Sequence, residues 1–234
     1  MKRIRGFLFA LLTIAIILGN VIPARADAGI TFSAIADCHL TNSTPRRRLE
    51  LAMKEIGNQP AIDCGDIADT PAERPYQDYA KITRGSVKAV AGNHDLPNMR
   101  YFQRYVGQDQ HSFVAGGVLF VGFNGDPRGF SAKWLEEQMA GFCGPIVLFN
   151  HYPIFVPKDY QSYLMNPGPM KEVLRIISQY NVVAFISGHV HESFVLKRGK
   201  TTFVGVPSLG RKGSFVRITI TGENVSVSIV SVFL

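Results

Sequence analysis

The chain has 234 residues, of which 46% are hydrophobic and 18% charged, so it can build an apolar core and is not a disordered chain. Its formal charge of +7 would favour a nucleic-acid or membrane partner. Four of the basic residues lie within the first 26 positions, however, and without them 21 basic residues stand against 18 acidic ones, a charge of +3. We therefore expect no specific nucleic-acid binding.

The first 26 residues have the three segments of a secretory signal peptide. A basic cluster within the first five residues precedes an uncharged apolar run at 7–18, and Ala-Arg-Ala at 24–26 is a cleavage motif. Even extended to Ile22, the run would form a helix of about 24 Å, shorter than the roughly 30 Å of a bilayer core. We expect a mature chain that starts near Asp27 and is secreted or periplasmic, in contact with a membrane only if the leader is retained.

Short apolar strands and helices alternate along the mature chain until about residue 190, after which strands alone are predicted. The first strands are expected at residues 29–36, 60–64, 87–91, 112–115, 118–123, 146–150 and 182–187. The last four are expected at 193–197, 201–206, 214–220 and 224–233. The fourth and fifth strands form a hairpin because Gly116-Gly117 between them is suited to a tight turn.

Five helices are expected between these strands, and three of them have recognisable starts. Thr44 is expected to cap the helix that runs to about residue 56, with Pro45 in its first position. Thr70 and Glu73 have the spacing of a capping box, and Ser131 is expected to cap a fourth helix. The other two helices are expected at 98–106 and 170–179.

The order of these elements predicts the fold class. Strand–helix units come first and antiparallel strands last, which favours an α/β sandwich in which two sheets pack together and helices cover the outside. No linker-like stretch interrupts residues 27–234, so we expect one domain.

Five of the six histidines follow a predicted strand, where open α/β sheets carry their sites. Each is accompanied by, or lies near, an aspartate, an asparagine or a glycine. The blocks are Asp37-Cys38-His39, Gly65-Asp66, Gly92-Asn93-His94-Asp95, Asn150-His151 and Gly188-His189-Val190-His191.

These blocks, in this order, resemble the calcineurin-like metallophosphoesterase family, whose pattern is D-x-H, GD, GNHD, a later H, and GHxH. The resemblance implies a four-layer αββα sandwich, with two mixed sheets flanked by helices and two metal ions at the strand ends. It assigns one metal to Asp37, His39 and His191, and the other to Asn93, His151 and His189. Asp66 would bridge both ions, His94 would contact the phosphate or protonate the leaving group, and Asp95 would orient His94.

Oxygen and imidazole ligands without thiolate suit Mn, Fe, Zn, Ni or Co. The resemblance implies in-line attack on phosphorus by a hydroxide that bridges two such ions. We expect an exported phosphoesterase acting on a small-molecule phosphate ester, with phosphodiesters, including cyclic nucleotides, favoured. A phosphomonoesterase, a nucleotide pyrophosphatase and a non-catalytic metal-binding protein remain alternatives. The oligomeric state is left open.

Several other residues near these blocks have simpler explanations. Asp63 and Asp69 are expected to be solvated or to cap a helix, and His111 to be structural. Cys38 and Cys64 are expected to be buried thiols, with a disulfide between them as the alternative in an exported protein. The family's purple acid phosphatases have a tyrosine three residues after the bridging aspartate, where this chain has Asp69, which argues against a tyrosinate–iron centre.

The segment 155–169 is the best candidate for a loop that determines specificity. It lies between His151 and the helix expected at 170–179. It contains Lys158, Tyr160 and Tyr163, which could contact a base or a phosphate.

Overall fold

The computed structural model describes residues 29–70 and 72–234. The leader predicted at residues 1–26 lies outside the described residues, and its cleavage stays a prediction. Within 29–70 and 72–234, no helix is both long and apolar enough to cross a bilayer.

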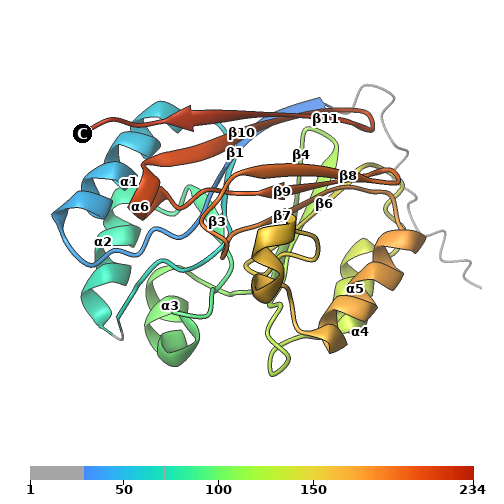
Figure 1. The fold of residues 1–234 in the computed structure, drawn as a ribbon, viewed down its shortest axis with the longest axis horizontal. Helices are drawn as coiled ribbons and strands as arrows, with labels where there is room; N and C mark the ends of the chain where they lie inside the picture. Colours follow the sequence, from blue (N-terminus) through green and yellow to red (C-terminus); the bar gives the residue numbers. More distant parts are fainter. Residues whose placement is uncertain (1–28, 71) are drawn as a thin grey trace, which may run out of the picture.

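The chain forms two mixed β-sheets (Figure 1). The first sheet has the strand order β11 (Asn224–Ser231), β10 (Ser214–Thr221), β1 (Gly29–Ile35), β2 (Ala61–Asp63) and β3 (Val87–Ala89). The second has the order β4 (His111–Ala115), β5 (Val118–Gly122), β6 (Ile146–Asn150), β7 (Val182–Ser187), β9 (Thr201–Gly205) and β8 (Phe194–Arg198). β1, β2 and β3 are parallel, as are β5, β6, β7 and β9, while β10, β11, β4 and β8 pair antiparallel.

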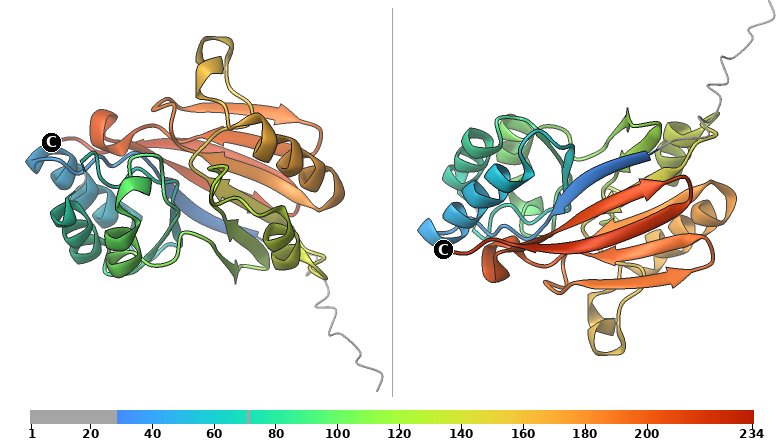
Figure 2. Two further views of the ribbon diagram at one scale, coloured as in Figure 1. Left: turned by 90° about the horizontal axis from the view of Figure 1, so that it is seen from below. Right: turned by 90° about the horizontal axis from the view of Figure 1, so that it is seen from above.

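Helices cover the outer face of each sheet, so the four-layer αββα sandwich predicted from the sequence is confirmed (Figures 1 and 2). The helices packed on the first sheet are α1 (Ser43–Ile56), α2 (Glu73–Thr83) and α3 (Met99–Tyr105). Those on the second are α4 (Ala132–Met139) and α5 (Pro167–Gln179). Three shorter helical segments complete the described chain: η1 (Leu96–Asn98), η2 (Lys158–Tyr163) and α6 (Leu209–Lys212).

The main core lies between the two sheets. Strand residues such as Phe32 and Val216 from the first sheet meet Phe120 and Phe149 from the second, all fully buried. The rings of Phe32 and Phe120 pack edge to face with centroids 4.8 Å apart. Because both faces of β5, β6 and β7 are covered, these strands are apolar almost throughout rather than alternating, which explains why short continuous apolar runs predicted them.

The helix starts show where local sequence signals misled. Asn42, not Thr44, caps α1, because its side chain accepts a hydrogen bond from the Thr44 N–H at 3.0 Å. α2 begins at Glu73 after Ala72, whose methyl group cannot cap, so the capping box expected at Thr70 is wrong. The cap at Ser131 is confirmed by its bond from the Trp134 N–H.

The strands that precede the histidine blocks end at one edge of the sandwich, and backbone hydrogen bonds join the loops there. The N–H of Asp37 donates to the carbonyl of Gly65 at 2.8 Å, and that of His39 to Asp66 at 3.0 Å. The N–H of Gly188 donates to the carbonyl of His151 at 3.1 Å. The fold therefore brings blocks that lie far apart in sequence into one rigid rim.

Candidate metal centre

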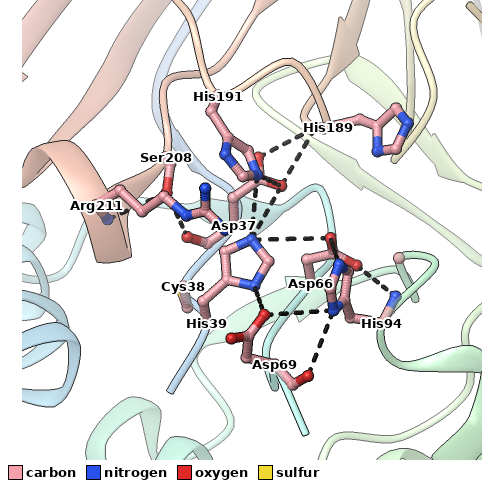
Figure 3. A network of polar contacts seen from close by, with 12 residues as sticks. Asp37, Cys38, His39, Asp66, Asp69, His94, His189, His191, Ser208 and Arg211 are labelled. Atoms are coloured by element: carbon pink, nitrogen blue, oxygen red, sulfur yellow. Dashed lines mark hydrogen bonds and ion pairs between the residues drawn. The ribbon is translucent and has the colours of Figure 1, made fainter. Parts of the chain in front are cut away.

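The first group of polar side chains at this rim consists of Asp37, His39 and His191 (Figure 3). The His191 Nε2 lies 3.2 Å from Asp37 Oδ1 and 3.1 Å from His39 Nε2. Burial alone would raise the pKa of Asp37, but the hydrogen bond from His191 and the nearby histidines hold it below its ordinary value. Asp37 is therefore an ionised carboxylate at the bottom of the site.

The second group consists of Asp66, His151 and His189, with Asn93 beside them. The His151 Nε2 is the centre of this group: it lies 2.9 Å from Asn93 Oδ1, 3.0 Å from His189 Nδ1 and 3.4 Å from Asp66 Oδ2. Its other ring nitrogen lies 2.9 Å from the Cys64 carbonyl, which fixes the orientation of the ring.

Asp66 lies between the two groups. Its Oδ2 atom is 3.4 Å from His151 Nε2 in the second group and 3.9 Å from His39 Nε2 in the first. One carboxylate can hold two cations about 3.5–4 Å apart, and Asp66 has the placement that such sharing needs.

The chemistry of the donors fits metal ions. Burial lowers the pKa of His39 to about 4 and that of His189 to about 3, the charge of His151 adding to the latter, so both rings are neutral near pH 7 and offer lone pairs. Two pairs of imidazole nitrogens converge to 3.0 and 3.1 Å, as ligands directed at a shared centre do. Burial would also lower the pKa of His151, but Asp66 and Asp37 raise it, so a metal would displace a proton there.

The backbone of the rim is strained at the donor residues. Six non-glycine residues in the described part of the chain have positive φ, and five of them are Asp37, His39, Asp66, His189 and His191. Such conformations are uncommon for non-glycine residues, and when they cluster they mark functional sites held by the surrounding structure. The strain independently picks out five of the residues that the histidine pattern had selected.

Close approach explains two of the glycines that precede donors. A Cβ on Gly92 would overlap the Asp66 carboxylate, and one on Gly188 would lie 2.8 Å from Asp37 Oδ2. Any side chain at either position would displace a donor oxygen, so the loops can meet only with glycine there.

Comparison with known proteins agrees with this geometry. Residues 30–193 match the model of the calcineurin-like phosphoesterase family. The chain belongs to this family.

Individual relatives of this phosphoesterase are distant. A protein of Synechococcus sp. named "probable cyclic nucleotide phosphodiesterase" is 27% identical over 62% of the chain and 62% of its own length. A Bos taurus protein named "serine/threonine-protein phosphatase CPPED1" is 28% identical over 56% of the chain and 52% of its own length. The matches thus span less than two thirds of either relative.

The fold also has solved counterparts. A dimetal phosphatase from Danio rerio superposes with a TM-score of 0.66 at 13% identity, covering 86% of this chain and 98% of that one. At this identity the likeness shows the fold alone.

Within this phosphoesterase, His94 stands at the open side of the donor groups, with 38% of its side chain exposed. Its Nε2 lies 4.0 Å from Asp66 Oδ2, and its Nδ1 lies 3.3 Å from Asp69 Oδ1. Asp69 also lies 3.1 Å from His39 Nδ1. Asp69 is exposed, as its predicted solvated role requires, but it also lies beside these two histidines, which the sequence did not lead us to expect. Its position three residues after Asp66, where relatives can have a tyrosine ligand, was the signal that could have found it.

Asp95 does not orient the ring of His94, although the family resemblance assigned it that role. Both carboxylate oxygens of Asp95 accept hydrogen bonds from other groups, and the Asp69 carboxylate lies beside the His94 ring instead. Asp95 is fully buried and accepts hydrogen bonds from the Tyr76 hydroxyl and from the backbone N–H groups of Asp66, Ile67, Ala68 and Gly92. Burial and the nearby charge of Asp66 raise its pKa to about 6. Asp95 thus joins the loop that carries Asp66 to the loop that carries Asn93.

Asp63, the last residue of β2, also supports the loop that carries Asp66, so the solvated or capping role predicted for it is wrong. It is fully buried, accepts hydrogen bonds from the Tyr79 hydroxyl and the Gly65 N–H at 2.9 Å, and lies 3.8 Å from the Cys38 sulfur. Cys38 and Cys64 are buried free thiols in the described chain, so the disulfide alternative is not realised there.

Proposed function

We propose that the protein is a metal-dependent phosphoric ester hydrolase that favours phosphodiesters, cyclic nucleotides among them. The observation that carries the proposal is the pair of donor groups that share Asp66, with His94 on their open side. In this proposal Asp37, His39 and His191 hold one ion, Asn93, His151 and His189 hold the other, and Asp66 contacts both. Mn, Fe, Zn, Ni and Co all suit these donors.

Bound ions would supply positive charge to the phosphate oxygens and lower the pKa of a bound water to about 7. The protein's own groups then have distinct tasks. Asp37 and Asp66 balance part of the cationic charge and fix the ions in place. His94 holds a proton at Nε2 for the oxygen of the departing alcohol, a role worth about 10²–10⁴-fold in rate.

Asp69 supports that task. Its carboxylate lies 3.3 Å from the His94 Nδ1, and its backbone carbonyl lies 3.4 Å from the same nitrogen and can accept its proton in a hydrogen bond. With Nδ1–H held by Asp69, the proton that is free to leave is the one at Nε2, which faces the donor groups.

Two functions compete with this proposal. The names of the relatives include both a phosphodiesterase and a phosphatase, so a phosphomonoesterase is the main alternative, with a nucleotide pyrophosphatase of the same family as a further one. A non-catalytic metal-binding protein is less favoured because every donor position of the family pattern is filled and the donors converge.

The test is a matrix of metals and substrates with the chain that starts at Asp27. Protein loaded in turn with Mn²⁺, Fe²⁺, Ni²⁺ or Zn²⁺ is given bis(4-nitrophenyl) phosphate and 4-nitrophenyl phosphate. We expect metal-dependent release of nitrophenol, faster from the diester, and its loss in Asp66→Ala. Absence of turnover with every metal would refute the hydrolase, and faster monoester turnover would favour the alternative.

We also propose that the protein is exported after cleavage near Asp27. The support is the basic, apolar and small-residue order of residues 1–26. N-terminal sequencing of the protein from its native cell tests this: a first residue near Asp27 agrees, and a retained leader contradicts it.

A further inference from the structure

Three rings pack against the imidazole of His189, a donor of the second group. The centroid of His151 lies 4.7 Å from that of His189, and the centroids of Tyr152 and Tyr163 lie 5.1 and 5.5 Å from it. The planes of the two tyrosines make angles of 67° and 74° with the imidazole, so both pairs meet edge to face. Aromatic pairs favour this arrangement at centroid distances of about 4.5–7 Å. The tyrosine rings therefore restrict how the imidazole can turn.

No hydrogen bond from the described chain orients the outer edge of this imidazole. Its Nδ1 faces the second group, 3.0 Å from His151 Nε2, and its Nε2 has no hydrogen-bond partner in the part of the chain that the structure describes. By contrast, the outer nitrogen of His151 lies 2.9 Å from the Cys64 carbonyl. Histidines that bind metals almost always have such a partner, which fixes the ring. For His189, the tyrosine rings are the side chains placed to do this.

Tyr152 contacts both histidines of the second group. It directly follows His151, and its ring centroid lies 5.1 Å from the centroid of each histidine. The loop after β5 packs closely on this ring, because a Cβ built on Gly125 would lie only 3.2 Å from Tyr152 Cδ2. The ring is thus fixed by its surroundings and can in turn hold His189.

Tyr163 reaches His189 from a distant segment of the chain. It is the last residue of η2, the short gold turn that projects from the body of the molecule in Figure 2, and its side chain is 41% exposed. The next residue, Leu164, lines a cavity of about 370 Å³ whose wall also includes His189 and Tyr152. The segment 155–169, which the sequence predicted to determine specificity, therefore contacts a donor histidine through one ring.

We propose that Tyr152 and Tyr163 are positioning residues, whose rings hold the His189 imidazole so that its Nδ1 faces the second donor group. The inference rests on the proposed function for the binding of an ion by this group, and it adds two residues that lie outside the histidine blocks. A ligand that is already oriented loses less freedom on binding, so an imidazole held in this way binds an ion more tightly than one that can rotate.

Calorimetric titration of the metal-free protein with Mn²⁺ tests the role of the rings without a phosphate ester. Tyr152→Leu should lower the affinity for one of the two ions about 10–100-fold, the loss typical of residues that orient a ligand, and leave the affinity for the other ion unchanged. Tyr152→Phe, which keeps the ring, should bind both ions as the wild type does. Unchanged binding in Tyr152→Leu, or an equal loss in Tyr152→Phe, would overturn the role of this ring.

Tyr163→Ala keeps the test decisive if Tyr152→Leu folds poorly, because the Tyr163 side chain is exposed and its loss should leave the melting temperature unchanged. The affinity for the same ion should fall about two- to tenfold, the contribution of one aromatic pair. In the metal-free protein, the ring-proton NMR signals of His189 should also shift, whereas those of His191, which packs against His39, should not. His189 signals that match those of the wild type in this variant would overturn the proposal. Because neither measurement uses an ester, failure of the hydrolase and failure of the positioning role are distinguishable.

Discussion

The two halves of the candidate metal centre are built differently. The half carried by β1, β2 and β3 rests on two buried carboxylates, Asp63 and Asp95, each bound to a tyrosine hydroxyl of α2 at 2.9 Å. The half carried by β6 and β7 is bordered by exposed aromatic rings, a cavity and the unpartnered amide of Asn150. The two buried carboxylates of the first half are satisfied by the chain, whereas neither polar side-chain atom of Asn150 in the second half has a hydrogen-bond partner among the described residues.

This difference suggests that the two halves have different roles. α2 places Tyr76 and Tyr79 three residues apart, about one helical turn, so both hydroxyls reach into the same buried region. They brace the loops that carry Asp66 and Asn93. Substitutions in the first half should therefore affect both metal binding and folding, and those in the second half should affect the orientation of His189 or the choice of substrate with little effect on folding.

The largest effect is expected at the residue of the first half that lies between the two donor groups. Asp66→Ala removes the carboxylate that lies between both donor groups, so turnover of a phosphodiester should fall by more than about 100-fold, beyond the loss typical of residues behind the ligands. Metal content measured by mass spectrometry should fall with it. Full metal content together with full activity would show that the two groups do not share this residue.

Substitution of His94 tests the proton-donating role proposed for the open side of the first half. His94→Gln should lower kcat for an ester with a poor leaving group by about 10²–10⁴-fold, with little change for a 4-nitrophenyl ester, which needs no protonation. Asp69→Asn should lower kcat less strongly but with the same dependence on the leaving group, because Asp69 lies 3.3 Å from the His94 Nδ1. Equal losses for both leaving groups would contradict a proton-donating role.

Asp95→Asn should destabilise the first half. Asp95 accepts four backbone N–H groups and one hydroxyl, and an amide NH₂ would oppose at least one of these donors. We expect the free energy of unfolding to fall by about 2–4 kcal/mol in urea titrations. The matched substitution in the second half is Asp126→Asn, which breaks an exposed ion pair and should lower it by about 1 kcal/mol or less. If both substitutions lowered the free energy of unfolding by similar amounts, the proposed difference between the halves would be contradicted.

The tyrosines of α2 should have smaller effects. Tyr76→Phe removes only the hydroxyl that donates to Asp95 and should lower the free energy of unfolding by about 1–2 kcal/mol. It should also weaken Mn²⁺ binding, because the Asp66 loop loses a support. Tyr163→Phe, in the second half, should change neither quantity. A Tyr76→Phe variant with unaltered metal affinity would show that α2 supports folding but not metal binding.

The stability of the metal-free protein should depend on pH through a buried histidine in each half, and the pH range of the two contributions should differ. The pKa of His189 is lowered from 6.5 to about 3 and that of His39 to about 4, mainly by burial. The unfolded chain therefore binds protons first as the pH falls below 6.5, and stability present above that pH is lost toward pH 3 or 4. His189→Asn and His39→Asn should each melt with less dependence on pH than the wild type, which thermal unfolding from about pH 7.5 to about pH 4.5 can detect. If the melting temperatures of these variants changed with pH as much as that of the wild type, these lowered pKa values would be contradicted.

Much of the fold and of the donor set could be predicted from the sequence because both depend on short local patterns. Apolar runs marked the strands, and the histidine blocks followed them directly. The roles of Asp63 and Asp95 could not be predicted, because most of their partners lie on other segments of the chain. Asp95, for instance, is bound by Tyr76, 19 residues earlier, and by the loop after β2. The cap at Asn42 was missed because Thr44 offered an equally good local signal.

The account's central claim is that Asp66 joins two donor groups into one two-metal site. Mn²⁺ titration of the metal-free protein, followed by electron paramagnetic resonance, tests it most directly. We predict two bound ions per chain with the spectrum of a coupled pair, and loss of that coupling in Asp66→Ala. A single uncoupled ion in the wild type, or a coupled pair that survives Asp66→Ala, would contradict the account.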